Sequence, residues 1–276
     1  MKSLSLPVTD DHIHIDPVNG RGIEAAKDFL RAGGTHMFLV SKPAWSLGVH
    51  PSQPADYAYV FNETIRIATM IEETGIVVFT VLGIHPAEIT RLSERMSLSE
   101  AVGVMKGGLD LAAQYIREGK AVALKSGRPH YEVTTDILTA SNEVLFHALT
   151  LAGECQCALQ VHAESGPCSD VPEMARRAGM PAERVVKHYG SPETLLHPSL
   201  IAKHEAIPQL ARERRPFTME SDYMDENSRP GAVIGPKSVP RYTKNLLNSG
   251  LISEEDWFRI HAVTVEKVYG VTVTLV

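Results

Sequence analysis

Short apolar segments alternate with helical patterns along the whole chain. These segments are rich in β-branched residues or continuously apolar, which is typical of strands buried on both faces of a sheet. The predicted strands are Leu6–Ile15, Thr35–Val40, Ile76–Gly83, Ala121–Ser126, Ala158–Ala163, Arg184–Tyr189, Leu200–Lys203 and Phe217–Ser221. The predicted helices are Ile23–Ala32, Ala55–Thr74, Leu98–Glu118, Ser141–Gly153, Asp170–Gly179, Glu205–Arg214 and Ser253–Tyr269. Strands that alternate with helices indicate parallel βαβ units.

Eight such strands predict a closed α/β architecture, the (β/α)₈ TIM barrel, formed by residues 1–276 as a single domain. The chain has 276 residues, and barrels of this kind typically take about 250 residues. An open doubly wound sheet is the alternative fold, but the chain lacks the glycine-rich dinucleotide fingerprint after its first predicted strand.

The composition is that of an ordinary globular protein with a mild negative charge. Hydrophobic residues make up 43% of the chain, and the formal net charge is −6. The chain can therefore bury a core, and it lacks the overall basic character of a nucleic-acid-binding domain. Nucleic acid is not favoured as a partner on this ground, although bound metals and local arginines can offset the net charge.

The cysteines and the N-terminus predict a cytoplasmic location. The three cysteines Cys155, Cys157 and Cys168 do not resemble a disulfide framework, because their number is odd and two of them are nearly adjacent. The N-terminus lacks the apolar region of a signal peptide, and no apolar run is long enough for a transmembrane helix. We therefore expect no membrane partner; a homo-oligomer stays open.

The first predicted strand contains a pair of histidines, His12 and His14. Residues two apart on a strand point to the same side. Both imidazoles would therefore project together at the end of the strand, where two ring nitrogens can bind one metal ion. A pair of polar residues at a strand end is the alternative interpretation.

Three further residues that can bind metals end other predicted strands. His162 ends the fifth strand, His188 the sixth and Asp222 the eighth. Barrel enzymes place their active sites at this C-terminal edge of the sheet. A histidine buried in the core explains any one of these positions, but it does not explain four histidines and an aspartate in this arrangement.

Lys125 ends the fourth predicted strand, in the segment Ala121–Ser126. Burial lowers the pKa of a lysine and makes its neutral amine nucleophilic. Such an amine can react with carbon dioxide to form a carbamate, whose two oxygens can bridge two metal ions. The alternative is a charged lysine that reaches solvent or pairs with Asp16 or Glu220.

At these residues the chain resembles the amidohydrolase superfamily and, within it, the TatD-like metal-dependent hydrolases. The matching segments are Asp11–His14, Gly83–Pro86, Gly127, Val161–Glu164, Lys187–Tyr189 and Met219–Asp222. Residues 128–131, Arg-Pro-His-Tyr, resemble an archaeal-type branch of that group. Lys125 departs from the TatD-like pattern, which has a glutamate at this position, and resembles the carboxylated lysine of phosphotriesterase-type relatives.

The resemblance implies a binuclear metal site. His12, His14 and Asp222 would bind one ion, His162 and His188 would bind the other, and Lys125 would bridge them. Zinc is the expected metal, since its ligands include histidine nitrogen and carboxylate oxygen; manganese, iron, cobalt and magnesium are alternatives. Asp222 would also serve as the general base.

Further polar residues follow the predicted strands and are candidates for substrate binding. They are His85, Arg128, His130 and His204. An arginine close to histidines suits a phosphate or a carboxylate group. The segment from Asp225 to Pro240, rich in proline and glycine, is a candidate cover for the active site.

Three functions follow from these patterns. The favoured one is hydrolysis of a phosphoester by a metal-activated hydroxide, as in a TatD-like DNase or phosphodiesterase acting on a nucleotide-type or other small substrate. Lys125 supports a second function, hydrolysis of a lactone, an amide or a phosphotriester. The third is a non-catalytic barrel that binds a metal or a ligand; it predicts metal without turnover.

Overall fold

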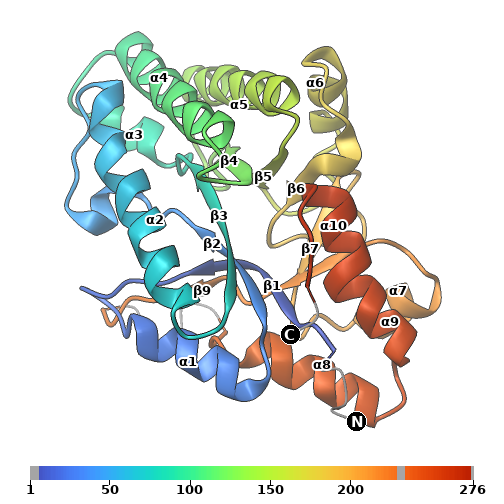
Figure 1. Ribbon diagram of the computed structural model, residues 1–276. Helices are drawn as coiled ribbons and strands as arrows, with labels where there is room; N and C mark the ends of the chain where they lie inside the picture. The colour runs from blue at the N-terminus through green and yellow to red at the C-terminus, as the bar shows by residue number, and fades with distance from the viewer. Residues whose placement is uncertain (1–5, 229–233, 275–276) are drawn as a thin grey trace. The chain divides into compact units, whose positions relative to one another are not determined.

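The computed structural model describes residues 6–228 and 234–274. The chain forms two compact units (Figure 1). The first consists of Met1–Leu39, Arg66–Phe79 and Pro198–Val276, and the second of Val40–Ile65 and Thr80–His197. Whether they act as the single domain expected from the sequence stays a prediction, and each unit is described by itself.

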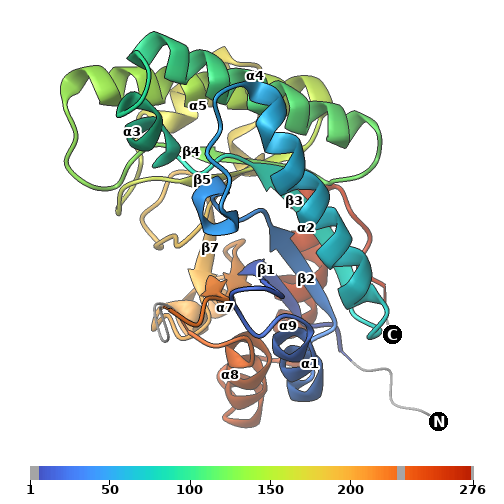
Figure 2. The same ribbon diagram turned by 90° about the vertical axis from the view of Figure 1, so that its left-hand side faces the viewer.

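Parallel strands and the helices that follow them build the first unit. Its strands are β1 (Thr9–His14), β2 (His36–Val40) up to Leu39, the first part of β3 (Val77–Gly83), β7 (His197–Ile201) from Pro198, β8 (Thr218–Glu220) and β9 (Tyr223–Met224). Its helices are α1 (Ile23–Ala32), α7 (Ile207–Arg212), α8 (Ser238–Asn248), α9 (Glu254–Phe258), the π-helical turn η4 (Arg259–Val263) and α10 (Thr264–Tyr269). β1 pairs in parallel with β2 and β9, and β7 pairs in parallel with β8. Helices α1 and α8 lie side by side (Figure 2).

The second unit repeats the same alternation. Its strands are β4 (Ala123–Gly127), β5 (Ala158–His162), β6 (Val185–Lys187) and the later part of β3 (Val77–Gly83). Its helices are η1 (Ala44–Leu47), η2 (Pro54–Asp56), the first part of α2 (Tyr57–Glu72), α3 (Glu88–Ser93), α4 (Leu98–Arg117), α5 (Thr135–Cys155), α6 (Val171–Arg177) and η3 (Ala182–Arg184). The strands pair in parallel in the order β3-β4-β5-β6. Helices α4 and α5 lie side by side (Figure 1).

Each unit has its own hydrophobic core. In the second unit, the apolar sides of α4 and α5 pack with strand residues such as Leu124 and Leu159, which are fully buried. In the first unit, one cluster lies around Phe29 and Ile13, and another lies around Phe217 and neighbouring apolar residues. These cores hold the strands whose C-terminal ends carry the predicted ligands.

Several predicted boundaries were wrong. β7 covers His197–Ile201 instead of Leu200–Lys203, because the chain turns after Ile201, whose carbonyl accepts the backbone N–H of His204 at 2.7 Å. Helix α5 begins at Thr135 instead of Ser141, since Thr134 caps it by accepting the Ile137 N–H.

The last predicted helix, Ser253–Tyr269, is interrupted by the turn η4. Helix α3 was not predicted, and α8 begins inside the predicted loop Asp225–Pro240. Residues 229–233 of that loop lie outside the described residues, so its role as a cover stays a prediction.

Candidate metal centre

His12 and His14 point to the same side of β1 in the first unit. Both side chains are buried, with 0% and 2% exposed. Their Nε2 atoms lie 3.2 Å apart. Two nitrogens bound tetrahedrally to one zinc ion at about 2.0–2.1 Å would be about 3.3 Å apart. The pair therefore has the spacing of two ligands on one ion.

Asp222 adds a carboxylate to this pair. Its backbone N–H donates to the carbonyl of His12 at 2.9 Å, and its Oδ1 lies 3.9 Å from His12 Nε2. Asp222 has a φ of 46°, in the left-handed region that residues with a β-carbon rarely adopt. Such strain costs on the order of 1–3 kcal/mol and is concentrated at functional sites. In the first unit, His12 thus lies next to a second imidazole on one side and near a carboxylate on the other, and zinc accepts both kinds of donor.

Two acidic residues in the neighbourhood of His12 were missed as functional residues by the sequence analysis. Asp10 Oδ1 accepts the N–H of Ser221 at 3.0 Å and that of His12 at 3.3 Å. It thereby ties β1 to the residue before Asp222. Burial raises the pKa of Asp10 to about 7 and that of Asp11 to about 6. The pair Asp10-Asp11 directly before the two histidines was the available sequence signal.

The loop after His14 is held by another aspartate, Asp225. Its fully buried carboxylate accepts backbone N–H groups from Asp16 at 3.0 Å, Arg21 at 2.7 Å and Gly22 at 2.8 Å. The hydroxyl of Tyr223 donates to it at 2.9 Å. Asp225 therefore fixes the backbone that leaves β1.

In the second unit, Lys125 and His162 share one side of the sheet. In the register of β4 and β5, Lys125 lies opposite Gln160 and Gly127 lies opposite His162. Because side chains alternate along a strand, Lys125 and His162 project from the same side. Lys125 is buried, with 3% exposed. A second buried lysine that the sequence analysis missed, Lys187, donates from Nζ to the carbonyl of His188 at 2.9 Å.

The imidazoles of the second unit form a chain of contacts centred on His162. Its Nδ1 lies 2.8 Å from His188 Nε2, and its Nε2 lies 2.7 Å from His130 Nδ1. Burial, and next the charges of His85 and Lys125, hold the pKa of His162 well below its usual range. His162 is therefore a neutral imidazole at physiological pH, as a metal ligand must be.

His85 and His204 have their tautomers fixed by the backbone. The Nδ1 of His85 accepts the N–H of Ala87 at 3.2 Å, and the Nδ1 of His204 accepts the N–H of Ala206 at 3.2 Å. A neutral imidazole that accepts at Nδ1 carries its proton at Nε2. Each therefore presents an N–H donor, and the ring of His85 lies 4.6 Å from that of His162 between centroids.

Arg128 has all five guanidinium hydrogens engaged. Two bonds go to Glu164, two to Asp170 at 2.6 and 2.9 Å, and one to Asn142 at 3.2 Å. Its side chain is 8% exposed. The predicted role of Arg128 in binding a substrate anion stays a prediction, and in this structure its donors bind acidic side chains of the protein.

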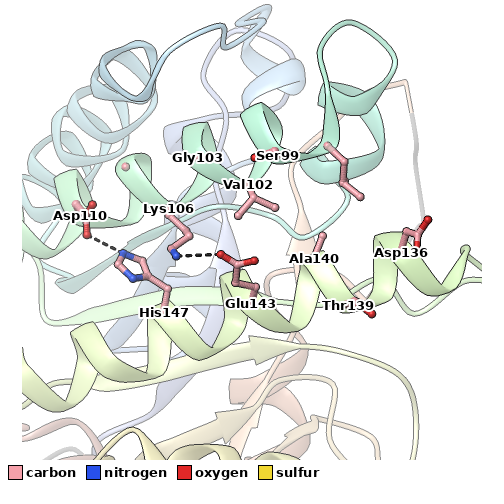
Figure 3. Close-up of a pocket in the computed structure, with 12 residues that line it drawn as sticks. Ser99, Val102, Gly103, Lys106, Asp110, Asp136, Thr139, Ala140, Glu143 and His147 are labelled. Atoms are coloured by element: carbon pink, nitrogen blue, oxygen red, sulfur yellow. Dashed lines mark hydrogen bonds and ion pairs between the residues drawn. The ribbon is translucent and has the colours of Figure 1, made fainter.

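The second unit has a cavity beside residues 128–133 and another between α4 and α5. The first cavity, of about 500 Å³, is lined by residues 128–133, by Leu138 and Asn142 of α5, and by Glu164 and Asp170, which lie between β5 and α6. The other, of about 620 Å³, lies between α4 and α5. Figure 3 shows its ion pairs, Lys106 with Glu143 and Asp110 with His147. The predicted site residues Arg128 and His130 line the smaller cavity, and none of the predicted site residues lines the larger one.

Comparisons with known protein sequences found a matching family and a similar protein. A sequence profile described as TatD related DNase matches residues 9–270. An uncharacterised protein of Methanocaldococcus jannaschii is 36% identical, with 98% of each chain covered.

Several solved structures have folds similar to that of this chain. They include a mutant of a phosphotriesterase-like lactonase from Deinococcus radiodurans (TM-score 0.64, 16% identity, 98% of each chain covered) and a TatD homologue from Escherichia coli (TM-score 0.62, 15% identity, 96% of this chain and 98% of the other). The organophosphorus hydrolase from Deinococcus radiodurans has a TM-score of 0.57 at 15% identity, covering 98% of this chain and 94% of the other. These likenesses confirm the predicted TIM-barrel fold class.

Proposed function

The chain belongs to the TatD-related DNase family and is a metal-dependent hydrolase, and we propose that it cleaves an ester-type bond at a centre of two divalent metal ions. The observation that carries this proposal is the group of His12, His14 and Asp222, two imidazoles 3.2 Å apart and a carboxylate 3.9 Å from one of them. These three residues would hold one ion, and zinc suits their donors.

His162 and His188 would hold the second ion, and Lys125 would bridge the two. The low pKa of His162 supports this role, because a neutral imidazole keeps a lone pair for a metal. Burial of Lys125 supports the carbamate, because a buried lysine more readily loses its proton. Its Nζ would form a bond to the carbon of carbon dioxide and release one proton, leaving a bridging anion.

The ions, when bound, would lower the pKa of a shared water and polarise the scissile ester. Asp222 would take the proton of that water as the general base. His85 and His204 would each offer an Nε2–H donor to the substrate's oxygens, since their Nδ1 atoms accept backbone N–H groups. His130 would orient His162 through their hydrogen bond.

A phosphoester is the first candidate substrate, of a nucleotide type, because the family is described as DNases. A lactone, amide or phosphotriester is the second, because Lys125 stands where TatD-like hydrolases have a glutamate. The net charge of −6 does not favour long nucleic acids. A cytoplasmic location and a homo-oligomer stay predictions; in the described part of the chain no helix has the length and hydrophobicity of a membrane span.

The experiment that tests the proposal is the metal content per chain, measured by plasma mass spectrometry after loading with mixed divalent metals in bicarbonate. The same preparation is assayed on bis(p-nitrophenyl) phosphate and on a γ-lactone. Two ions with turnover of either substrate support the proposal, and the substrate that is cleaved selects between the two candidates. One ion excludes the binuclear site. Two ions without turnover of any ester support a non-catalytic metal-binding barrel, and no retained ion overturns the proposal altogether.

A further inference from the structure

The 500 Å³ cavity of the second unit adjoins His162, a proposed ligand of the second ion. His130 lines this cavity, and its Nδ1 lies 2.7 Å from Nε2 of His162, a proposed metal ligand. The ring centroids of these two histidines are 4.8 Å apart. A substrate whose scissile bond lies beside His162 therefore has room for a further group in this cavity.

The charged part of the cavity wall presents oxygens to its interior. Arg128 is the cation among the lining residues, and only 8% of its side chain is exposed. The carboxylates that bind it, Glu164 and Asp170, are 40% and 52% exposed. Because all five donors of Arg128 bind protein side chains, none is left to bind an anion of the substrate. Glu132 adds a further acidic side chain to the lining.

Apart from His130 and Asn142, the remaining wall is apolar. Tyr131 and Leu138 line the cavity and are 41% and 40% exposed, so both present apolar surface to it. Val133 lies in the same lining. The hydroxyl of Tyr131 is hydrogen-bonded to Thr90 of α3 at 2.9 Å, which fixes the ring at the cavity. Apolar side chains next to acidic oxygens suit a group that is uncharged and apolar.

We propose that this cavity is the subsite for the part of the substrate remote from the scissile bond, and that it accepts an uncharged apolar group and rejects an anionic one. The inference rests on the proposed function and narrows it to esters with an uncharged, apolar substituent. An anion placed here would meet the carboxylates of Glu164, Asp170 and Glu132 while the guanidinium of Arg128 stays covered. A polynucleotide, with a charge on every phosphate, fits this wall poorly.

The experiment compares two esters that differ in one terminal charge, p-nitrophenyl hexanoate and mono-p-nitrophenyl adipate, on the metal-loaded protein. We expect kcat/KM to be at least about tenfold higher for the uncharged ester, the factor that about 1.4 kcal/mol of discrimination gives. Leu138→Asp should remove most of this preference, and the control Leu251→Asp, at a leucine that is 45% exposed and outside the cavity, should retain it. Asp170→Asn should raise kcat/KM for the adipate ester by about tenfold, whereas Asp136→Asn should not.

A binding measurement separates the subsite from catalysis. Calorimetric titration with 2-nonanone, an uncharged ligand without a hydrolysable bond, should show binding that Leu138→Asp weakens by about tenfold. Binding that depends on Leu138 without turnover of these two esters, of bis(p-nitrophenyl) phosphate or of a γ-lactone would leave the subsite intact and overturn the proposed function. Equal kcat/KM for both esters, unchanged in Leu138→Asp, would overturn the subsite and leave the hydrolase intact.

Discussion

Gly83 packs against the backbone of Lys125 so closely that a β-carbon at residue 83 would lie 1.8 Å from the Lys125 carbonyl oxygen. The two residues are paired in the register of β3 and β4, and the N–H of Ile84 donates to the same carbonyl at 3.1 Å. The absence of a side chain at Gly83 therefore sets the position of the strand end that carries Lys125.

Gly83→Ala should destabilise the protein severely, because the clash is with backbone that cannot move without opening the sheet. We expect a loss of about 3 kcal/mol or more in the free energy of unfolding, measured by urea denaturation. The control is Gly103→Ala on α4, where an added β-carbon meets nothing within 4 Å. Alanine is the better helix former, so this variant should gain about 0.5–1 kcal/mol. Equal stability of the two variants would contradict the close approach.

His12→Ala and His14→Ala should each lose the ion held by the first unit. Removing one of two imidazole ligands leaves an incomplete donor set, so metal content per chain should fall and kcat/KM should drop by at least about 100-fold. His50→Ala is the control, because His50 is an exposed histidine in a loop of the second unit. Retained metal in both strand variants, measured by plasma mass spectrometry, would rule out these ligands.

Lys125→Glu tests the carbamate directly. The variant supplies a permanent carboxylate, so it should retain two ions per chain whether or not bicarbonate is present. The natural protein should need bicarbonate to reach two ions, and Lys125→Ala should retain one. Intact-protein mass spectrometry of the natural protein should show the added mass of carbon dioxide. Two ions in Lys125→Ala would contradict a bridging role.

Arg128→Lys should destabilise the protein although it keeps the charge. A lysine cannot make the paired hydrogen bonds of Arg128 to Glu164 and Asp170. We expect a loss of about 1–3 kcal/mol in the free energy of unfolding. Arg176→Lys is the matched control, since Arg176 also makes two bonds to one carboxylate, that of Glu173, but is 73% exposed. Arg176→Lys should change the free energy of unfolding by no more than about 0.5 kcal/mol. Equal losses of stability in both variants would show that burial of the ion pair is unimportant.

Glu88 should make stability depend on pH. It is 2% exposed, and burial raises its pKa from 4.5 to about 7, although the N–H of Ala44 donates to it at 2.8 Å. Between these values the folded protein binds more protons than the unfolded chain, so the contribution of Glu88 to stability falls as the pH rises from about 4.5 to above 7. A shift of this size corresponds to about 3 kcal/mol.

Glu88→Gln removes this titration while keeping an oxygen that can accept the Ala44 N–H. The variant should therefore gain stability relative to the natural protein by about 2–3 kcal/mol between pH 5 and pH 8.5. Urea denaturation at the two pH values measures the change. Glu94→Gln, at an exposed glutamate after α3, should show no such gain. A gain of the same size in both variants would exclude Glu88 as its source.

The sequence by itself determined the alternation of strands and helices and the row of ligand candidates. Strands buried on both faces must be apolar along their length, so a histidine or lysine at a strand end stands out, as His12, His162 and Lys125 do. Helix α1 was predicted with its observed bounds, Ile23–Ala32, because two glycines, Gly33 and Gly34, follow it; in the structure Gly33 adopts the left-handed conformation that ends a helix. These signals are local and can be read from neighbouring residues.

Only the tertiary structure decided what surrounds each side chain. Whether Arg128 binds a substrate depends on Glu164 and Asp170, which lie 36 and 42 residues away in the chain. The left-handed backbone of Asp222 depends on its bond to the carbonyl of His12, and the raised pKa of Glu88 depends on burial. Such properties come from contacts between distant segments, and no local pattern of residue types encodes them.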